Sequence, residues 1–147
     1  MLGLAPRVVR AKMAEQLAIA EKESEPGIKM EESHLQGPGG RLGARLYHPE
    51  ELSGVLPTLV YFHGGGHMLG GLATHDGLCR RISKGARCRV ISLEYRLSPE
   101  DPFPAAVDDG IAGFRWVVER ADDFGVDTSR LGVGGDSAEG ISRPSCR

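Results

Sequence analysis

The residues best suited to chemistry stand near the end of the chain, in the run Leu131-Gly-Val-Gly-Gly-Asp-Ser-Ala-Glu-Gly140. A short apolar strand leads into glycines, turns at Ser137 and is expected to enter a helix. This is the pattern of a nucleophile elbow, in which a strained strand-to-helix turn exposes a serine hydroxyl. The amide of Ala138, at the start of that helix, would face the same side and stabilise a developing oxyanion. The run therefore predicts acyl transfer with Ser137 as nucleophile.

A second glycine-rich stretch, His63-Gly-Gly-Gly66, follows a predicted buried strand at 58–62. Open α/β sheets bind their ligands where parallel strands end. Three successive glycines let backbone N–H groups approach a substrate closely, as an oxyanion hole requires. Alone, the stretch could equally be a flexible connection. With the serine turn one strand–helix unit downstream, it predicts an oxyanion hole at this loop.

The elements that must position these two stretches alternate between strand and helix, which predicts a mostly parallel α/β sheet with helices on both faces. After the strand at 58–62 we expect a helix at 74–86, a strand at 89–95, a helix at 105–121 and the strand before Ser137. The candidate core residues of the last helix are Val107, Ile111, Phe114, Trp116 and Val118.

The chain before this unit reads as a helix followed by a hairpin. Apolar residues recur every three to five positions from Leu4 to Ala20 with charges between them, which predicts an amphipathic helix. The charged run at 21–25 and Pro26-Gly27 indicate a linker. An extended pattern from Ile28 and the turn at 37–40 predict a β-hairpin. One face of its second strand carries Leu42, Ala44 and Leu46.

Composition excludes several classes of function. The 147 residues are 40% hydrophobic and 26% charged with a net charge of −2, as in one globular domain. Scattered basic residues give no basis for nucleic-acid binding, and no apolar run has the length of a membrane span. The charged N-terminal segment is not a secretory signal, so a cytoplasmic protein is expected. Cys79, Cys88 and Cys146 lack metal-ligand spacing and are expected to be free thiols, with no metal or cofactor.

The sequence resembles the hormone-sensitive-lipase-like branch of the α/β-hydrolase esterases over roughly residues 40–138. Four stretches carry the resemblance, in the order in which the family has them. They are Tyr61-Phe-His-Gly-Gly-Gly66, Thr74-His-Asp76 with Cys79-Arg80, Tyr95-Arg-Leu-Ser-Pro-Glu100 through Phe103-Pro-Ala105, and Gly135-Asp-Ser-Ala138.

This resemblance implies a serine carboxylesterase that cleaves short to medium acyl esters through an acyl-serine intermediate, without a metal. It implies that Ser137 is the nucleophile and that the amides of Gly65, Gly66 and Ala138 form the oxyanion hole, with Gly64 shaping the loop. The N-terminal helix would form part of a lid over the acyl pocket. The substrate would be a small carboxylic ester.

The sequence departs from the family after the serine. In α/β-hydrolases the triad acid and then its histidine follow the nucleophile, yet no histidine follows Ser137. Glu139 stands where the family has glycine, and both differences predict low activity. The histidines all lie upstream, and none of them is expected to be the base. By resemblance His63 belongs structurally to the glycine loop, and we expect His67 near the pocket, His75 at a helix start, and His34 and His48 in solvent.

The tail 141–147 carries Pro144 where the family continues with a buried helix. Loss of one base from a possible codon string for that helix gives these residues, so we predict a disrupted reading frame. The expected division is a cap helix and linker (1–27), a partial α/β-hydrolase domain (28–140) and an aberrant tail (141–147).

An N-terminal half of this fold would leave the strand before Ser137 with an unpaired edge, which favours self-association. The leading interpretation is thus an esterase-lineage chain with little or no turnover. The alternative is a non-catalytic truncated protein, or an interaction module that pairs through that edge strand.

Several charged residues are expected to be structural. Asp136 would shape the elbow or cap the next helix, and Glu94, Arg96 and Glu100 would brace the loop behind the glycine stretch. Four further carboxylates are expected to be solvated helix charges: Asp108, Asp109, Asp122 and Asp123.

Overall fold

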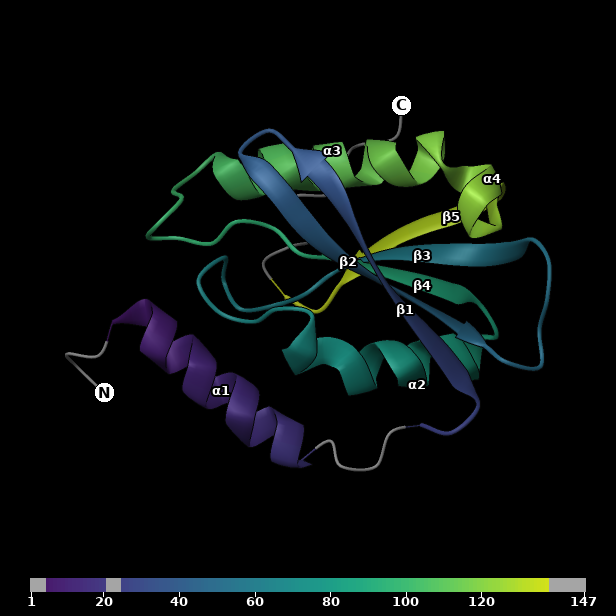
Figure 1. Cartoon of the computed structure of the whole chain (residues 1–147), viewed down its shortest axis with the longest axis horizontal. Coiled ribbons are helices and arrows are strands. Elements are labelled where there is room, and N and C mark those ends of the chain that lie inside the picture. The colour runs from purple at the N-terminus through teal and green to yellow at the C-terminus, as the bar shows by residue number, and fades with distance from the viewer. Residues whose placement is uncertain (1–4, 21–24, 138–147) are drawn as a thin grey trace.

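The computed structural model describes residues 5–20 and 25–137 and shows one sheet between two layers of helices (Figure 1). No helix among these residues is long and apolar enough to cross a bilayer. The strands are β1 (Ile28–Gly37), β2 (Gly40–Pro49), β3 (Leu56–Phe62), β4 (Arg89–Leu93) and β5 (Val126–Gly135). The helices are α1 (Pro6–Ala20), the 3-10 turn η1 (Ala73–His75), α2 (Asp76–Ala86), α3 (Ala105–Glu119) and α4 (Ala121–Phe124).

The five strands lie in the order β1-β2-β4-β3-β5. The predicted parallel part is present as β4-β3-β5, and the predicted hairpin β1-β2 joins it because β2 runs antiparallel to β4. Phe62 at the end of β3 lies opposite Leu93 of β4 and Gly135 of β5. The carboxyl ends of all three parallel strands therefore meet at one edge of the sheet.

Each face of the sheet has its own apolar cluster, because successive side chains of a strand point to opposite sides. On β3, Val60 and Phe62 belong to the cluster that packs with residues of α3 and α4, whereas Tyr61 belongs to the cluster on the α2 side. Figure 1 shows α3 and α4 over one face and α2 over the other. The three hairpin residues predicted to share a face all belong to the α3 side: Leu42, Ala44 and Leu46.

Helix α3 turns small residues toward the sheet, which corrects part of the predicted core. Val118 is 41% exposed, whereas its neighbour Val117 is fully buried. Gly110 and Gly113 are buried on the same face, and a Cβ at Gly113 would come within 2.6 Å of Leu93 Cδ1. The helix therefore packs too closely against β4 for a side chain at Gly113. The expected single helix at 105–121 is also interrupted, and α4 begins at Ala121.

Asp109 was expected in solvent but is 1% exposed. Its carboxylate accepts hydrogen bonds from the backbone N–H of Arg96 at 2.9 Å and from that residue's Nε and Nη2 at 2.8 and 2.9 Å. A carboxylate can be buried when it is paired and hydrogen-bonded in this way. The pair fixes α3 against the loop that follows β4, so Arg96 has the bracing role that the sequence indicated.

Replacing Asp109 by alanine is expected to destabilise the protein, because the Arg96 guanidinium would lose its partner. Arg96 keeps 24% of its side chain accessible and also lies 3.8 Å from Asp101, so we expect the loss to be smaller than that for a fully buried pair. Urea denaturation of Asp109→Ala measures it. Asp108→Ala, an exposed acid of the same helix, is the matched control and should change stability by less than about 0.5 kcal/mol. Equal effects of the two variants would contradict the assignment.

Candidate functional site

Two loops leave the sheet side by side at the ends of β3 and β5. The backbone N–H of Gly64 donates to Oδ1 of Asp136 at 2.6 Å, and the hydroxyl of Tyr61 donates to the same oxygen at 2.5 Å. The residue after Asp136 is Ser137, which is exposed. The turn that carries the predicted nucleophile is thus tied directly to the glycine loop.

The glycine loop adopts conformations that require glycine. A Cβ at Gly64 would lie 2.5 Å from Oδ2 of Asp136, so a side chain there would displace the carboxylate. Gly65 has φ +133° and Gly66 has φ +62°, values that side-chain-bearing residues rarely adopt. The Gly65 carbonyl accepts hydrogen bonds from the amides of Met68 and Leu69 at 3.1 and 3.0 Å. The loop is therefore a tight turn of defined shape.

His63 supports this loop from inside the protein. Its ring is fully buried and stacks on Tyr95 with centroids 4.3 Å apart. The Tyr95 hydroxyl donates to the His63 carbonyl at 2.6 Å, and Nδ1 of His63 lies 3.1 Å from the Gly64 carbonyl. Desolvation lowers the pKa of His63 to about 4, so the imidazole is neutral at pH 7. This geometry suits the structural role that the resemblance implied for His63.

Asp136 shapes the serine turn through three contacts. Besides the bonds from Gly64 and Tyr61, its Oδ2 lies 3.2 Å from Nε2 of His75. Burial opposes the charged form, but the hydrogen bonds from Tyr61 and Gly64 and the nearby His75 outweigh it and lower the pKa of Asp136. Of the two roles expected for Asp136, the structure shows the shaping of the elbow. The helix expected after it lies outside the described residues.

His75 is the site residue that the sequence pattern did not reveal. It stands at the start of α2, as predicted, but its ring also reaches the turn before Ser137. The available signal was its place in Thr74-His-Asp76, one of the stretches shared with the esterases. His75 precedes α2 but makes no side-chain hydrogen bond that caps the helix. Its presence in the shared motif is therefore explained by another contact, the one with Asp136.

A cavity of about 380 Å³ lies beside the glycine loop. Met13 of α1 and Leu78 of α2 give it apolar walls, and Arg81 contributes a cation. The remaining lining residues belong to the glycine loop, to the turn before α2 and to the serine turn: Gly64, Gly65, Gly70, Thr74, His75 and Asp136. The cavity thus combines backbone polar groups with an apolar wall, as small-molecule sites commonly do.

Helix α1 is held over this region by Arg10. The guanidinium donates to the carbonyls of Met68 and Ser98, both at 2.6 Å, and to the two carboxylate oxygens of Glu100 at 2.9 Å. Hydrogen bonds from Arg10 lower the pKa of Glu100 to about 2. Glu100 was expected to brace the loop after β4, and the structure shows that it also anchors α1 through Arg10.

Some of the predicted features lie outside the described residues. These are the oxyanion donor Ala138, the substitution at Glu139 and the tail at 141–147. Gly64 lies in the glycine loop, but its amide is engaged by Asp136, which suits a shaping role better than oxyanion binding. Within 5–20 and 25–137, His, Cys, Asp and Glu residues form no group of three or more that could hold a metal ion. The two cysteines among these residues, Cys79 and Cys88, are buried and form no disulfide.

Comparison with known proteins agrees with this arrangement. A family profile described as the α/β-hydrolase fold matches residues 59–141, which is more than half of the chain. The chain belongs to the α/β-hydrolase fold family. Within it, the similar proteins are hormone-sensitive-lipase-like esterases.

Relatives and solved structures are similar over most of this chain. It is 47% identical over 133 residues to the carboxylic ester hydrolase LipN of Mycobacterium tuberculosis, covering 88% of this chain and 35% of LipN. It is 41% identical to an ethyl acetate hydrolase of Pseudomonas putida, and the match covers 83% of this chain and 39% of that hydrolase. The solved structure of the metagenomic carboxylesterase EstE1 superposes with a TM-score of 0.89 at 39% identity. The superposition covers 97% of this chain and 48% of the EstE1 chain. The chain therefore spans less than half the length of these proteins.

The close approach of Gly64 to Asp136 makes Gly64→Ala a sensitive change. The added Cβ would push the carboxylate away and break a charge-assisted hydrogen bond, so we expect a loss of about 1–3 kcal/mol in urea denaturation. Gly85→Ala on α2 is the control, because a Cβ there meets nothing within 4 Å. Alanine at this helix position should add up to about 1 kcal/mol of stability. A Gly64→Ala protein as stable as Gly85→Ala would exclude the contact.

The depressed pKa of His63 predicts loss of stability in acid. The neutral ring is favoured in the folded state, so its contribution is complete above pH 6.5, the ordinary pKa, and is lost as pH falls toward the folded value of about 4. The loss attributable to this group is about 3 kcal/mol. Urea denaturation of wild type and His63→Gln between pH 7 and 4 gives the free energy of unfolding at each pH, and the two proteins are compared by its slope against pH. The exposed His34→Gln variant should keep the wild-type slope, and the prediction fails if His63→Gln keeps it too.

Proposed function

We propose that this chain carries the nucleophile and oxyanion portion of a serine carboxylic-ester hydrolase. The observation that carries the proposal is the 2.6 Å bond between Gly64 and Asp136, which brings the turn of Ser137 beside the glycine loop. Named relatives that hydrolyse carboxylic esters add support. In this assignment Oγ of Ser137 attacks the ester carbonyl, and the amides of Gly65, Gly66 and Ala138 stabilise the oxyanion.

The reaction requires a base as well as a nucleophile. The serine proton must leave as Oγ bonds to the carbonyl carbon, and the leaving alcohol must take up a proton when the tetrahedral intermediate collapses to the acyl-serine. His63 is neutral but buried under Tyr95, and no histidine follows Ser137 in the sequence. The 147 residues alone are therefore expected to turn over slowly or not at all.

The cavity beside the loop supports the proposed substrate class. Its volume of about 380 Å³ and the apolar contacts from Met13 and Leu78 suit a short to medium acyl chain. We assign α1 as the lid element on this side, because it contributes Met13 to the wall. A cytoplasmic location, the absence of nucleic-acid partners and self-association along β5 stay predictions.

An added base tests the assignment of Ser137. Imidazole at millimolar concentration replaces the missing proton acceptor while p-nitrophenyl butyrate hydrolysis is followed, and intact mass detects an acyl adduct on the protein. We expect wild type with imidazole to exceed Ser137→Ala with imidazole by about tenfold or more, with an adduct only when Ser137 is present. Ser53→Ala, an exposed serine of the loop before β3, is the matched control.

The proposed nucleophile is wrong if Ser137→Ala retains the adduct or the full imidazole-dependent rate. Activity that depends on Ser137 without imidazole would show that another group of the chain accepts the proton. Both measurements use the intact chain, and circular dichroism confirms that the variants fold.

A further inference from the structure

The stretch Thr74-His-Asp76 has no part in the chemistry proposed above, yet it lies between the hairpin and the serine turn. Its three side chains make contacts in three directions. Asp76 faces the hairpin, Thr74 faces the loop before it, and His75 faces Asp136. This arrangement is suited to hold the imidazole of His75 in place relative to the sheet.

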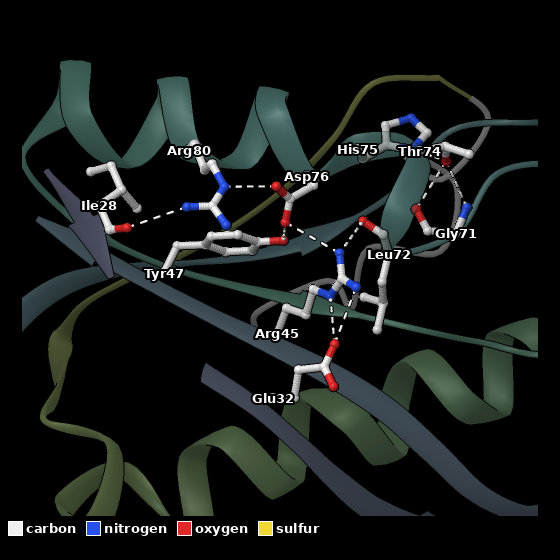
Figure 2. A network of polar contacts seen from close by, with 10 residues as sticks. All are labelled: Ile28, Glu32, Arg45, Tyr47, Gly71, Leu72, Thr74, His75, Asp76 and Arg80. Carbon is white, nitrogen blue, oxygen red and sulfur yellow. Dashed lines mark hydrogen bonds and ion pairs between the residues drawn. The ribbon is translucent and has the colours of Figure 1, made fainter. Parts of the chain in front are cut away.

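Asp76 fixes the start of α2 to the hairpin. Its Oδ1 accepts from the Tyr47 hydroxyl at 2.8 Å and from Nη1 of Arg45 at 3.2 Å, and its Oδ2 accepts from Nε of Arg80 at 2.6 Å. Arg45 also donates to Glu32 of β1 at 3.1 Å, so the network reaches the outermost strand (Figure 2). Tyr47 is fully buried, and its desolvation and bond to Asp76 raise its pKa. The hydroxyl therefore stays a donor.

Thr74 fixes the backbone on the other side of His75. Its Oγ1 accepts from the Gly71 amide at 2.9 Å and lies 2.9 Å from the Gly71 carbonyl and 2.8 Å from Nδ1 of His75 (Figure 2). The hydroxyl carries one hydrogen, so it donates either to that carbonyl or to a neutral Nδ1, and not to both. The imidazole is thus held at Nδ1, and its other nitrogen is directed away from the hairpin network.

The opposite nitrogen, Nε2, lies 3.2 Å from Oδ2 of Asp136. An ionised carboxylate only accepts hydrogen bonds, so Nε2 must carry the hydrogen. The other carboxylate oxygen accepts from Gly64 and Tyr61. Rotation of the Asp136 carboxylate would break the bond to Gly64, and the bond from His75 to Oδ2 opposes that rotation.

We propose that His75 is a positioning residue for the oxyanion loop. By holding Oδ2 of Asp136, it keeps Oδ1 on the Gly64 amide. This fixes the loop that carries the amides of Gly65 and Gly66 beside the turn of Ser137. The inference rests on the proposed function of that loop. Both ring nitrogens of His75 are engaged, so it does not act as the base for Ser137.

Nuclear magnetic resonance of the intact chain tests the contact. In wild type we expect Nε2 of His75 to carry the hydrogen and the Gly64 amide proton to lie downfield, as for a short bond to a carboxylate. His75→Leu should move the Gly64 resonance upfield and speed its amide exchange about tenfold or more. His75→Gln, whose amide can still donate to Asp136, should restore most of the wild-type resonance position and most of the wild-type exchange protection of Gly64. The control is His34→Leu, an exposed hairpin histidine bonded to Arg41, which should leave Gly64 unchanged.

Reaction of Ser137 with a p-nitrophenyl alkylphosphonate, with imidazole added as the base, separates this inference from the proposed function. We expect His75→Leu to react about tenfold more slowly than wild type, and His75→Gln to react at close to the wild-type rate. A loss of stability alone would lower the reaction rate of both variants. An unresponsive Gly64 resonance, or a wild-type Nε2 without hydrogen, overturns the inference even if Ser137 reacts. Failure of wild-type Ser137 to react, with Gly64 still responding to His75→Leu, overturns the proposed function and leaves the contact established.

Discussion

The bond between the Gly64 amide and the Asp136 carboxylate is the constraint on which the site depends. It is possible because parallel pairing places the ends of β3 and β5 together, with Phe62 opposite Gly135. It also requires a residue without a side chain, since a Cβ at Gly64 would occupy the space of the carboxylate. Backbone donors can be preorganised for an oxyanion only when the loop that carries them cannot relax.

The surroundings of this bond all restrict such relaxation. His63 and Tyr95 stack beneath the loop, and the positive φ angles of Gly65 and Gly66 turn the chain sharply above it. β3, which leads into the glycine loop, is held firmly in the sheet. It pairs with a strand on each side, and its alternate residues pack in both apolar clusters. The strand that pairs on both sides therefore continues directly into the glycine loop.

Sequence reasoning identified the features whose chemistry is local. The glycine run at 64–66, the hairpin and the alternation of strands and helices follow from short-range patterns, and the structure contains each of them in its described part. The predicted serine turn is described only as far as Ser137. Gly64 was predicted to shape the loop, and its contact with Asp136 shows how.

Features that depend on distant partners were not predictable in the same way. Asp109 resembles a solvated helix acid until Arg96 is known to lie against it. Val118 resembles a core residue because its size favours burial, but α3 packs through Gly113 and Val117. His75 has an ordinary place at a helix start, and its contact with Asp136 joins residues 61 positions apart. In each case tertiary packing overrode a local preference.

Arg10 gives the N-terminal helix several polar contacts through one side chain. The same guanidinium joins the carbonyl of Met68, which follows the glycine loop, to the carbonyl of Ser98 and the carboxylate of Glu100 beyond β4. Departure of α1 would thus leave two carbonyls and a carboxylate to be rehydrated at once, which favours all-or-none opening over gradual loosening. Dissolved salt screens the carboxylate contact more than the carbonyl contacts, so the ion pair between Arg10 and Glu100 is expected to weaken as ionic strength rises.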